Sequence, residues 1–229
     1  MKKIVIAIYI AILFFNPGCF KVPTEIPEGE WNYKLFTNNV LIGSSKISNF
    51  IVEDNYVLTS ELKLGIGNVS NISRHVIVET KSFAPVKLES YSKITTTDLL
   101  HETEIKAIFN GKKIEITSGN KKTTYYLDKN FILEGNFFLA KLIEGKFKKG
   151  LEIMASIYDP SIELEKPISV KTEVIGIKNV EIKGKGKSLI HIVQFIENIK
   201  IINIYLDENG IMIKGTIEML NMKIEIIKE

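Results

Sequence analysis

The chain has 229 residues, and its charges nearly balance, with 30 Lys+Arg against 27 Asp+Glu and a formal net charge of +3. A chain of this length buries enough surface to fold without disulfides or a metal, and its single cysteine cannot form an internal bridge. Arg74 is the only arginine in the sequence. Because base readout and phosphate clamping favour the planar guanidinium, the composition argues against nucleic acid as a partner.

Residues 1–18 have the layout of a signal peptide. Met1–Lys3 supplies a charged start, the apolar run Ile4–Phe15 follows, and Asn16-Pro17-Gly18 leads to Cys19. As a helix the apolar run spans roughly 18 Å, which is short for a hydrocarbon core of ~30 Å. A permanent transmembrane helix is therefore disfavoured.

Cys19 follows a small residue directly after this run, an arrangement that resembles the lipobox of bacterial lipoproteins. The resemblance implies cleavage before Cys19 and diacylglycerol on its sulfur, although Asn16 and Pro17 are atypical of the box. Two acyl chains give stable anchoring, and Phe20 in place of aspartate favours the outer membrane, facing the periplasm. The alternative is a secretory signal with an incidental cysteine, which would leave the protein free of the membrane. Residues 19–29 are expected to form a lipidated, extended tether.

Residues 30–229 are predicted to form one β domain, because no Pro- or Ser-rich linker interrupts them. β-Branched and aromatic residues recur in short runs bounded by Gly, Asn and Asp, which is the pattern of strands joined by hairpins. Asn110-Gly111 is the strongest hairpin signal, since both residues tolerate the positive φ of a type I′ turn, whereas Gly65–Ser73 is predicted to be a loop. The expected strands are Trp31–Phe36, Val40–Phe50, Tyr56–Leu64, His75–Thr80, Val86–Ile94, Glu102–Phe109, one beginning at Ile114, Thr123–Leu127, Leu151–Ile157, Ile168–Ile175, Val180–Lys183, Ser188–Glu197, Ile199–Leu206, Ile211–Glu218 and Met222–Ile227.

Only the segment 136–147 is predicted to be helical. Apolar residues such as Leu139 and Ile143 fall at i, i+4 spacing there, with Asn136 as an N-cap and Gly145 or Gly150 as a stop. One helix between two groups of short strands predicts a mainly β fold. We expect a single long curved antiparallel meander, either an open half-barrel or a two-layer sheet.

The strand Ile199–Leu206 is apolar on both faces. One face carries Ile201 and Tyr205, and the other carries Ile202 and Ile204. A half-solvated antiparallel strand would alternate cleanly, so this part of the sheet should be covered on both sides. The helix at 136–147, the sheet curling over itself, or something outside this protein could form the cover.

Six motifs at turns and strand edges are distributed over nearly all of the chain beyond the tether. They are Glu30-Trp31-Asn32-Tyr33, Ile42-Gly43, Phe83–Leu88, Tyr126-Leu127-Asp128, Lys149-Gly150 and Ile204–Ile211. In this order and spacing they resemble an uncharacterised family of bacterial envelope proteins, akin in architecture to the half-barrel lipoprotein carriers of the outer-membrane localisation pathway. The resemblance implies a curved sheet whose concave face accepts an acyl chain or another hydrophobic partner. It assigns no functional residues.

The sequence offers little for catalysis. The histidines are His75, His101 and His191, and none belongs to a metal-binding pair such as HxxxH, while Cys19 is committed to the anchor. His101 and Thr103 should share one strand face, with the two neighbouring glutamates on the other. We interpret His191 as a hydrogen-bonded strand residue and expect no cofactor, no metal and no enzyme activity. Aspartates next to predicted turns should bond their own backbone: Asp54, Asp98, Asp128, Asp159 and Asp207.

Three functions remain open from the sequence. The first is a noncatalytic, lipid-anchored envelope protein that binds or carries an apolar ligand such as an acyl chain. The second is a structural or assembly lipoprotein that docks another envelope protein. The third is an unrecognised hydrolase, which a deep pocket with two converging histidines or carboxylates would favour.

Overall fold

The computed structural model describes residues 24–128, 130–197, 199–207, 210–219 and 222–229. In these residues fourteen strands form one antiparallel sheet, and a single helix, α2, lies between β8 and β9 in sequence. The predicted fold, mainly β with an open meander and one short helix, is confirmed. The expected signal peptide and Cys19 lie outside the described residues. The elements are β1 (Gly29–Thr37), β2 (Val40–Val52), β3 (Asn55–Ile66), β4 (Val69–Thr80), β5 (Pro85–Thr95), β6 (Leu100–Asn110), β7 (Lys113–Ser118), β8 (Lys121–Tyr126), α2 (Phe137–Glu144), β9 (Glu152–Ile157), β10 (Ile168–Ile182), β11 (Lys185–Ile196), β12 (Ile199–Leu206), β13 (Met212–Met219) and β14 (Met222–Lys228).

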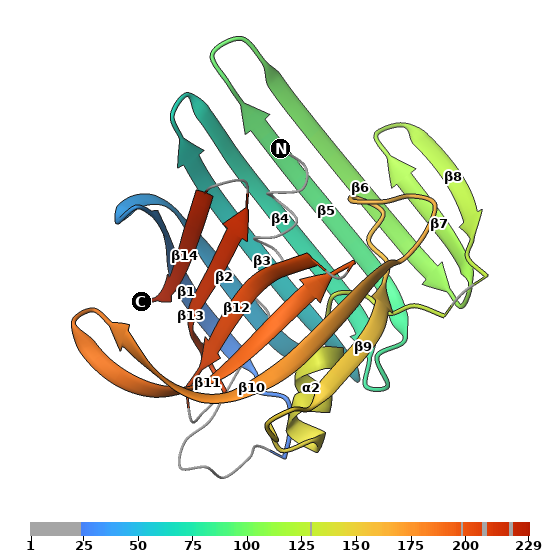
Figure 1. Ribbon diagram of the computed structural model, residues 1–229. Coiled ribbons are helices and arrows are strands. Elements are labelled where there is room, and N and C mark those ends of the chain that lie inside the picture. Colours follow the sequence, from blue (N-terminus) through green and yellow to red (C-terminus); the bar gives the residue numbers. More distant parts are fainter. Residues whose placement is uncertain (1–23, 129, 198, 208–209, 220–221) are drawn as a thin grey trace.

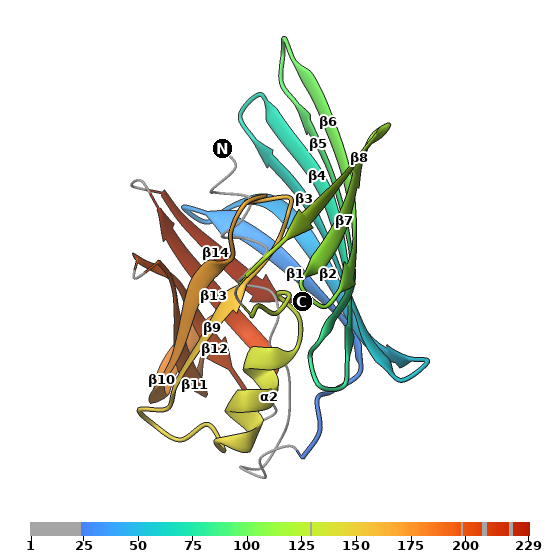
Figure 2. The ribbon, with the colours of Figure 1, turned by 90° about the vertical axis from the view of Figure 1, so that its right-hand side faces the viewer.

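The first and last strands of the chain pair with each other in the middle of the sheet. The strand order is β8-β7-β6-β5-β4-β3-β2-β1-β14-β13-β12-β11-β10-β9, so β1 pairs with β14, and β8 and β9 are the two edges. We call β1–β8 the first arm and β9–β14 the second arm. The two arms face each other as two layers, with α2 near one end of the space between them (Figures 1 and 2). The chain therefore encloses an interior between two arms of one open sheet.

Alternation along the strands decides which side chains enter this interior. In β4, Asn71, Ser73, His75, Ile77 and Glu79 are buried, whereas the residues between them are exposed or half-buried. The same period of two recurs on neighbouring strands, as expected for a sheet with one face against a core. Each fully buried Leu or Ile contributes about 1.5–3 kcal/mol to folding. The interior carries polar side chains as well as apolar ones.

The predicted loop at Gly65–Ser73 is wrong. β3 continues to Ile66, β4 begins at Val69, and Gly65 pairs with Ser70. Gly67 has φ +59, a conformation that glycine adopts without steric cost and that allows a two-residue connection. The polar residues of the segment lie at the exposed hairpin end and, for Asn71 and Ser73, on the buried face of β4.

The turn around Asn110-Gly111 is displaced by one residue from its predicted position. Asn110 still pairs with Lys113, so Gly111 and Lys112 are the central residues, and only Gly111 has a positive φ. A first central glycine with positive φ is typical of a type II′ turn rather than type I′. This register keeps Phe109 opposite Ile114, with both side chains buried.

The helix is shorter than predicted. α2 covers Phe137–Glu144, with Asn136 as N-cap and Gly145 following the last turn. Lys146 and Phe147, expected inside the helix, have positive φ values of 54 and 49, which a right-handed helix does not allow. The buried face of α2, which includes Leu139 and Leu142, belongs to the core between the arms.

Two further sequence predictions, for the tether before β1 and for the strand β12, can be compared with the structure. The described end of the expected tether packs on the sheet, because Ile26 is buried in the core and Asn49 Nδ2 donates to the Pro27 carbonyl at 2.9 Å. In β12, Ile202, Asn203 and Ile204 are all buried. The prediction that this strand is covered on both faces is confirmed for residues 202–204.

Candidate functional site

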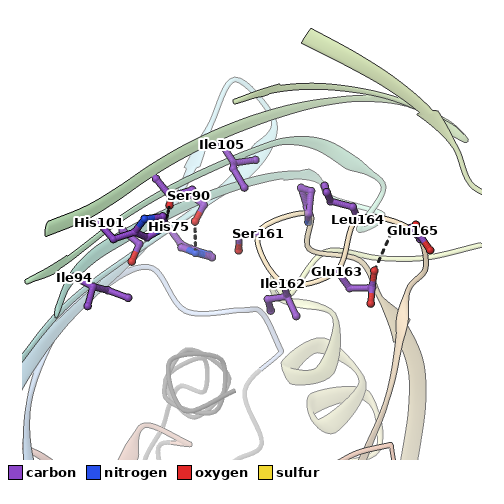
Figure 3. Close-up of a pocket in the computed structure, with 13 residues that line it drawn as sticks. His75, Ser90, Ile94, His101, Ile105, Ser161, Ile162, Glu163, Leu164 and Glu165 are labelled. Atoms are coloured by element: carbon purple, nitrogen blue, oxygen red, sulfur yellow. Dashed lines mark hydrogen bonds between the residues drawn. The ribbon is translucent and has the colours of Figure 1, made fainter. Parts of the chain in front are cut away.

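A cavity of about 420 Å³ lies between the inner face of the first arm and the connection from β9 to β10 (Figure 3). Three strands, β4, β5 and β6, supply one wall, and residues 160–165 of the connection supply the other. Its lining combines apolar, uncharged polar and acidic side chains. The lining residues are His75, Ser90, Ser92, Ile94, His101, Thr103, Ile105, Pro160, Ser161, Ile162, Glu163, Leu164 and Glu165.

Cross-strand register brings the polar lining together in rows. Ser90 lies opposite His75 on one side and opposite Ile105 on the other, and Ser92 lies opposite Thr103. Directly opposed residues have Cβ atoms about 4.5–5.5 Å apart. Hydroxyl and imidazole groups from three strands therefore form one continuous polar strip across the sheet wall of the cavity.

His75 is bonded within this strip. Its Nε2 lies 2.7 Å from Ser90 Oγ, and its Nδ1 lies 3.7 Å from Asp159 Oδ2. All three side chains are buried. Burial lowers the pKa of His75, and the nearby charge of Asp159 opposes that shift. A buried imidazole with a lowered pKa is neutral at pH 7, so Nε2 can accept the hydroxyl hydrogen of Ser90 when Nδ1 carries the ring proton.

The connection after β9 holds Asp159 in place. The backbone N–H and the hydroxyl of Ser161 both donate to Asp159 Oδ1 at 2.7 Å, and the backbone N–H groups of Ile162 and Glu163 donate to the Asp159 carbonyl at 3.0 Å. Tyr158, which is fully buried, donates its hydroxyl to the Leu164 carbonyl at 3.0 Å. The prediction that Asp159 bonds its own backbone at a turn is confirmed. The same bonds leave Oδ2 directed at His75.

The interior also holds two buried glutamates, of which Glu134 is affected by the charge of Asp159. Burial, followed by the charge of Asp159, raises the pKa of Glu134 well above its usual range. Burial also raises the pKa of Glu79 to about 7, against the opposing effect of hydrogen bonds from Asn136. The Asn136 backbone N–H donates to Glu79 Oε1 at 2.5 Å, and a Cβ at Gly135 would overlap that carboxyl group. The hydrogen bond between Glu79 and the Asn136 backbone therefore holds the start of α2 against β4.

The sequence predictions for the other histidines are confirmed. His101 Nε2 lies 3.0 Å from Thr103 Oγ1, so the two share a face, and both line the cavity. Glu102 lies on the other face, where it accepts a hydrogen bond from the Tyr91 hydroxyl at 2.8 Å. His191 Nε2 lies 2.9 Å from Asn203 Oδ1.

The grouping of His75, Ser90 and Asp159 was not predicted from the sequence. The available signal was the pairing of β4 with β5, since a short connection between Thr80 and Pro85 places His75 opposite Ser90. Nothing in the sequence places Asp159, on a connection of the second arm, against β4. Among the described residues no cluster of three or more His, Cys, Asp or Glu side chains could hold a metal ion.

No helix in the described part of the chain has the length and apolar character needed to span a membrane. The sequence matches no known family and no curated protein. The fold is similar to the crystal structure of a beta-barrel-like protein of domain of unknown function DUF1849 from Brucella abortus, with a TM-score of 0.61 and 11% sequence identity over 87% of this chain and 94% of that chain. At this identity the likeness shows the fold alone. The chain thus shares the architecture of a beta-barrel-like protein whose function is unknown.

Proposed function

We propose that the protein is a lipid-anchored component of the bacterial cell envelope that binds an uncharged ligand with an apolar body, such as the acyl part of a neutral lipid. The observation that supports ligand binding most directly is the cavity of about 420 Å³ beside β4–β6. Its volume lies within the roughly 300–1,000 Å³ typical of small-molecule sites. A ligand of this size enters the space between the arms rather than resting on the surface.

The side chains that line the cavity favour an uncharged ligand with an apolar body. Ile94, Ile105 and Ile162 offer apolar contact, and the hydroxyls of Ser92 and Thr103 offer hydrogen bonds without charge. Acidic side chains also line the cavity, namely Glu163 and Glu165, while no lysine or arginine of the described chain does. A free carboxylate or phosphate would be repelled there, so the site favours an ester, amide or alcohol head.

A binding experiment with the full chain carrying Cys19→Ala tests this proposal. The probe is a fluorescent, uncharged long-chain acyl amide, compared with the matching fluorescent fatty acid. Ile105→Trp fills the cavity and should weaken amide binding at least about tenfold, a loss of about 1.4 kcal/mol. Ile108→Trp is the matched control, because Ile108 lies on the same strand with 50% of its surface exposed. Equal binding by both variants would contradict the proposed site, and tighter binding of the fatty acid would contradict the proposed ligand class.

The anchor is tested separately. Lipidation of Cys19 predicts that cells fed an alkyne palmitate label the native chain and that Cys19→Ala abolishes the label. Two chains on one residue give stable membrane attachment, so the unlabelled variant should also leave the membrane fraction. Membrane attachment that survives the substitution would contradict the lipid anchor.

A docking role is the second candidate, and exposed apolar residues at the hairpin ends favour it. Val40 and Leu41 are 62% and 55% exposed, and Leu99 and Leu100 are 55% and 59% exposed. The β1–β2 and β5–β6 turns lie at the same end of the sheet because the strands alternate in direction. Photocrosslinkers placed at Leu41 and Leu99 in cells should then trap one shared partner. Crosslinks to unrelated neighbours would count against docking.

A further inference from the structure

At the wall of the cavity Ser90 is hydrogen-bonded to His75, and the carboxylate of Asp159 lies next to the other ring nitrogen. Ser90 Oγ lies 2.7 Å from His75 Nε2, and His75 Nδ1 lies 3.7 Å from Asp159 Oδ2. Ser90 and His75 both line the cavity (Figure 3), whereas Asp159 is not among the lining residues. A hydroxyl, an imidazole and a carboxylate in this order have the connectivity of a nucleophile, a base and an orienting group.

We propose that this site hydrolyses an uncharged acyl ester, with Ser90 as the nucleophile, His75 as the general base and Asp159 as a positioning residue. The inference rests on the proposed function, because it requires that an acyl ligand enter the same cavity. It goes beyond binding by giving the Ser90 hydroxyl a chemical role.

The reaction balances with water as the only co-reactant. His75 Nε2 takes the Ser90 hydroxyl proton while Oγ bonds to the ester carbonyl carbon. The carbon–oxygen bond to the alcohol then breaks, and the alcohol leaves with the proton from His75. Water next attacks the acyl-Ser90 ester, and His75 takes a proton from the water and returns it to Ser90 Oγ as the acid leaves. The net change is ester plus water to carboxylic acid plus alcohol.

The groups around Ser90 and His75 can support each step of this reaction. The imidazole is held neutral by burial, which leaves Nε2 able to accept a proton. When it becomes an imidazolium, Asp159 at 3.7 Å stabilises the charge, and Ser161 keeps that carboxylate in position. The hydroxyls of Ser92 and Thr103 lie one row along the same wall. Ser92 Oγ donates to Asn71 Oδ1 at 3.4 Å and Thr103 Oγ1 is bonded to His101 Nε2 at 3.0 Å, so either hydroxyl would exchange its partner to donate to the ester carbonyl oxygen.

The side chains of the lining also treat the substrate and the product differently. An ester is neutral and meets apolar side chains such as Ile105 and Ile162, so it can bind beside Glu163. The product is a carboxylate, which is repelled by the acidic side chains of the lining. The apolar side chains of the lining thus favour substrate binding, and its acidic side chains favour product release.

Covalent labelling of the full chain with Cys19→Ala tests the inference. An alkyl fluorophosphonate should modify Ser90, as read by peptide mass spectrometry, and p-nitrophenyl octanoate should be hydrolysed. Ser90→Ala should abolish labelling and lower hydrolysis at least about 100-fold, the usual scale for a positioned base and nucleophile. Ser45→Ala is the matched control, because Ser45 is a buried inner-face serine that donates to the Glu61 carbonyl at 2.8 Å, away from the cavity.

Asp159→Asn separates positioning from support of the fold. It should lower kcat with little change in KM, and move the acidic limb of the pH–rate profile to lower pH, because the carboxylate that holds up the His75 pKa is gone. A variant that merely loosens the fold would change KM and kcat together and leave that limb in place.

The outcomes distinguish the two proposals. If the uncharged acyl amide binds but Ser90 of the native site takes no label, hydrolysis is overturned and binding stands. If the amide does not bind and Ser90 takes no label, both proposals fail. Labelling confined to Ser90, competed by the amide, supports both. Because labelling is read on the chain with Ser90 intact, a folding defect in Ser90→Ala does not remove the test.

Discussion

Single residues in the interior carry polar groups that a core normally excludes. Glu79 is 1% exposed, and its Oε2 has no hydrogen-bond partner among the described residues. Glu134 is 7% exposed, and its Oε1 likewise has no partner there. A buried carboxylate with an unmade bond costs stability unless it is protonated. These two buried glutamates therefore make the free energy of unfolding depend on pH.

Glu79→Gln should flatten the dependence of stability on pH. The folded chain raises the Glu79 pKa from 4.5 to about 7, so between these values the folded state binds more protons than the unfolded state. The free energy of unfolding then falls as pH rises through this window, by about 3 kcal/mol in total, and levels off above it. Gln is neutral at every pH and can keep the bond from the Asn136 backbone, so the variant should be the more stable chain at pH 8.

The measurement is urea unfolding of the variant and the native chain at pH 5, 6, 7 and 8. His75 acts in the opposite direction, because a lowered histidine pKa removes stability as pH falls below 6.5. The difference between variant and native chain isolates Glu79 from that effect. Glu104→Gln, an exposed change of equal charge, is the control for the loss of one carboxyl group outside the interior. A constant difference for Glu79→Gln would show that its carboxyl is already ionised in the folded chain.

At the scale of elements, α2 is held to the first arm through the residues that precede it. The Asn136 backbone N–H bonds Glu79, and the Asn136 side chain donates to Asn49 Oδ1 at 3.0 Å. Gly135 allows the close approach, since any Cβ there would overlap the Glu79 carboxyl. One glycine thus sets how closely the helix lies against β2 and β4.

Gly135→Ala should destabilise the protein through this contact. Overpacking of a buried site costs about 1–3 kcal/mol, and here the loss should depend on Glu79. In a background of Glu79→Ala the added methyl group meets no carboxyl, so the same change should cost little. Unfolding of the four chains in a double-mutant cycle gives the coupling energy. A coupling energy near zero would mean that the methyl group is accommodated without displacing Glu79.

Elements with clear local signals could be predicted from the sequence. The strands around Phe109 and Ile114 alternate cleanly next to a glycine turn, and α2 has its apolar pairs at helical spacing. The loop predicted at Gly65–Ser73 was wrong because the inner face of β4 is polar there: Asn71 and Ser73 are buried, whereas Ile72 between them is exposed. A strand whose buried face is polar lacks the apolar alternation that marks a strand, so composition alone could not separate it from a loop.

At the scale of the whole molecule, the candidate site depends on how the two arms are closed. His75 and Ser90 come from one hairpin of the first arm, but Asp159 comes from the second arm. Local sequence predicts the hairpin and misses the third group, because the contact depends on the β1–β14 pairing that joins the two arms. That pairing joins residues as far apart as Tyr33 and Lys228, and no local pattern specifies so distant a partner.

The β1–β14 pairing should therefore control the stability of both arms together. Ile226 is fully buried on β14, between Leu35 on β1 and Gly215 on β13. Ile226→Ala should cost about 2–5 kcal/mol and speed hydrogen exchange of the slowest amides at least about 30-fold. The acceleration should be equal in β5 and β11, which lie in different arms, because neither arm encloses a core alone. Ile227→Ala, whose side chain is only partly buried, should have a smaller effect on both. Acceleration confined to β11 would show that the first arm is stable by itself, and the His75–Asp159 contact would then form between two independently folded halves.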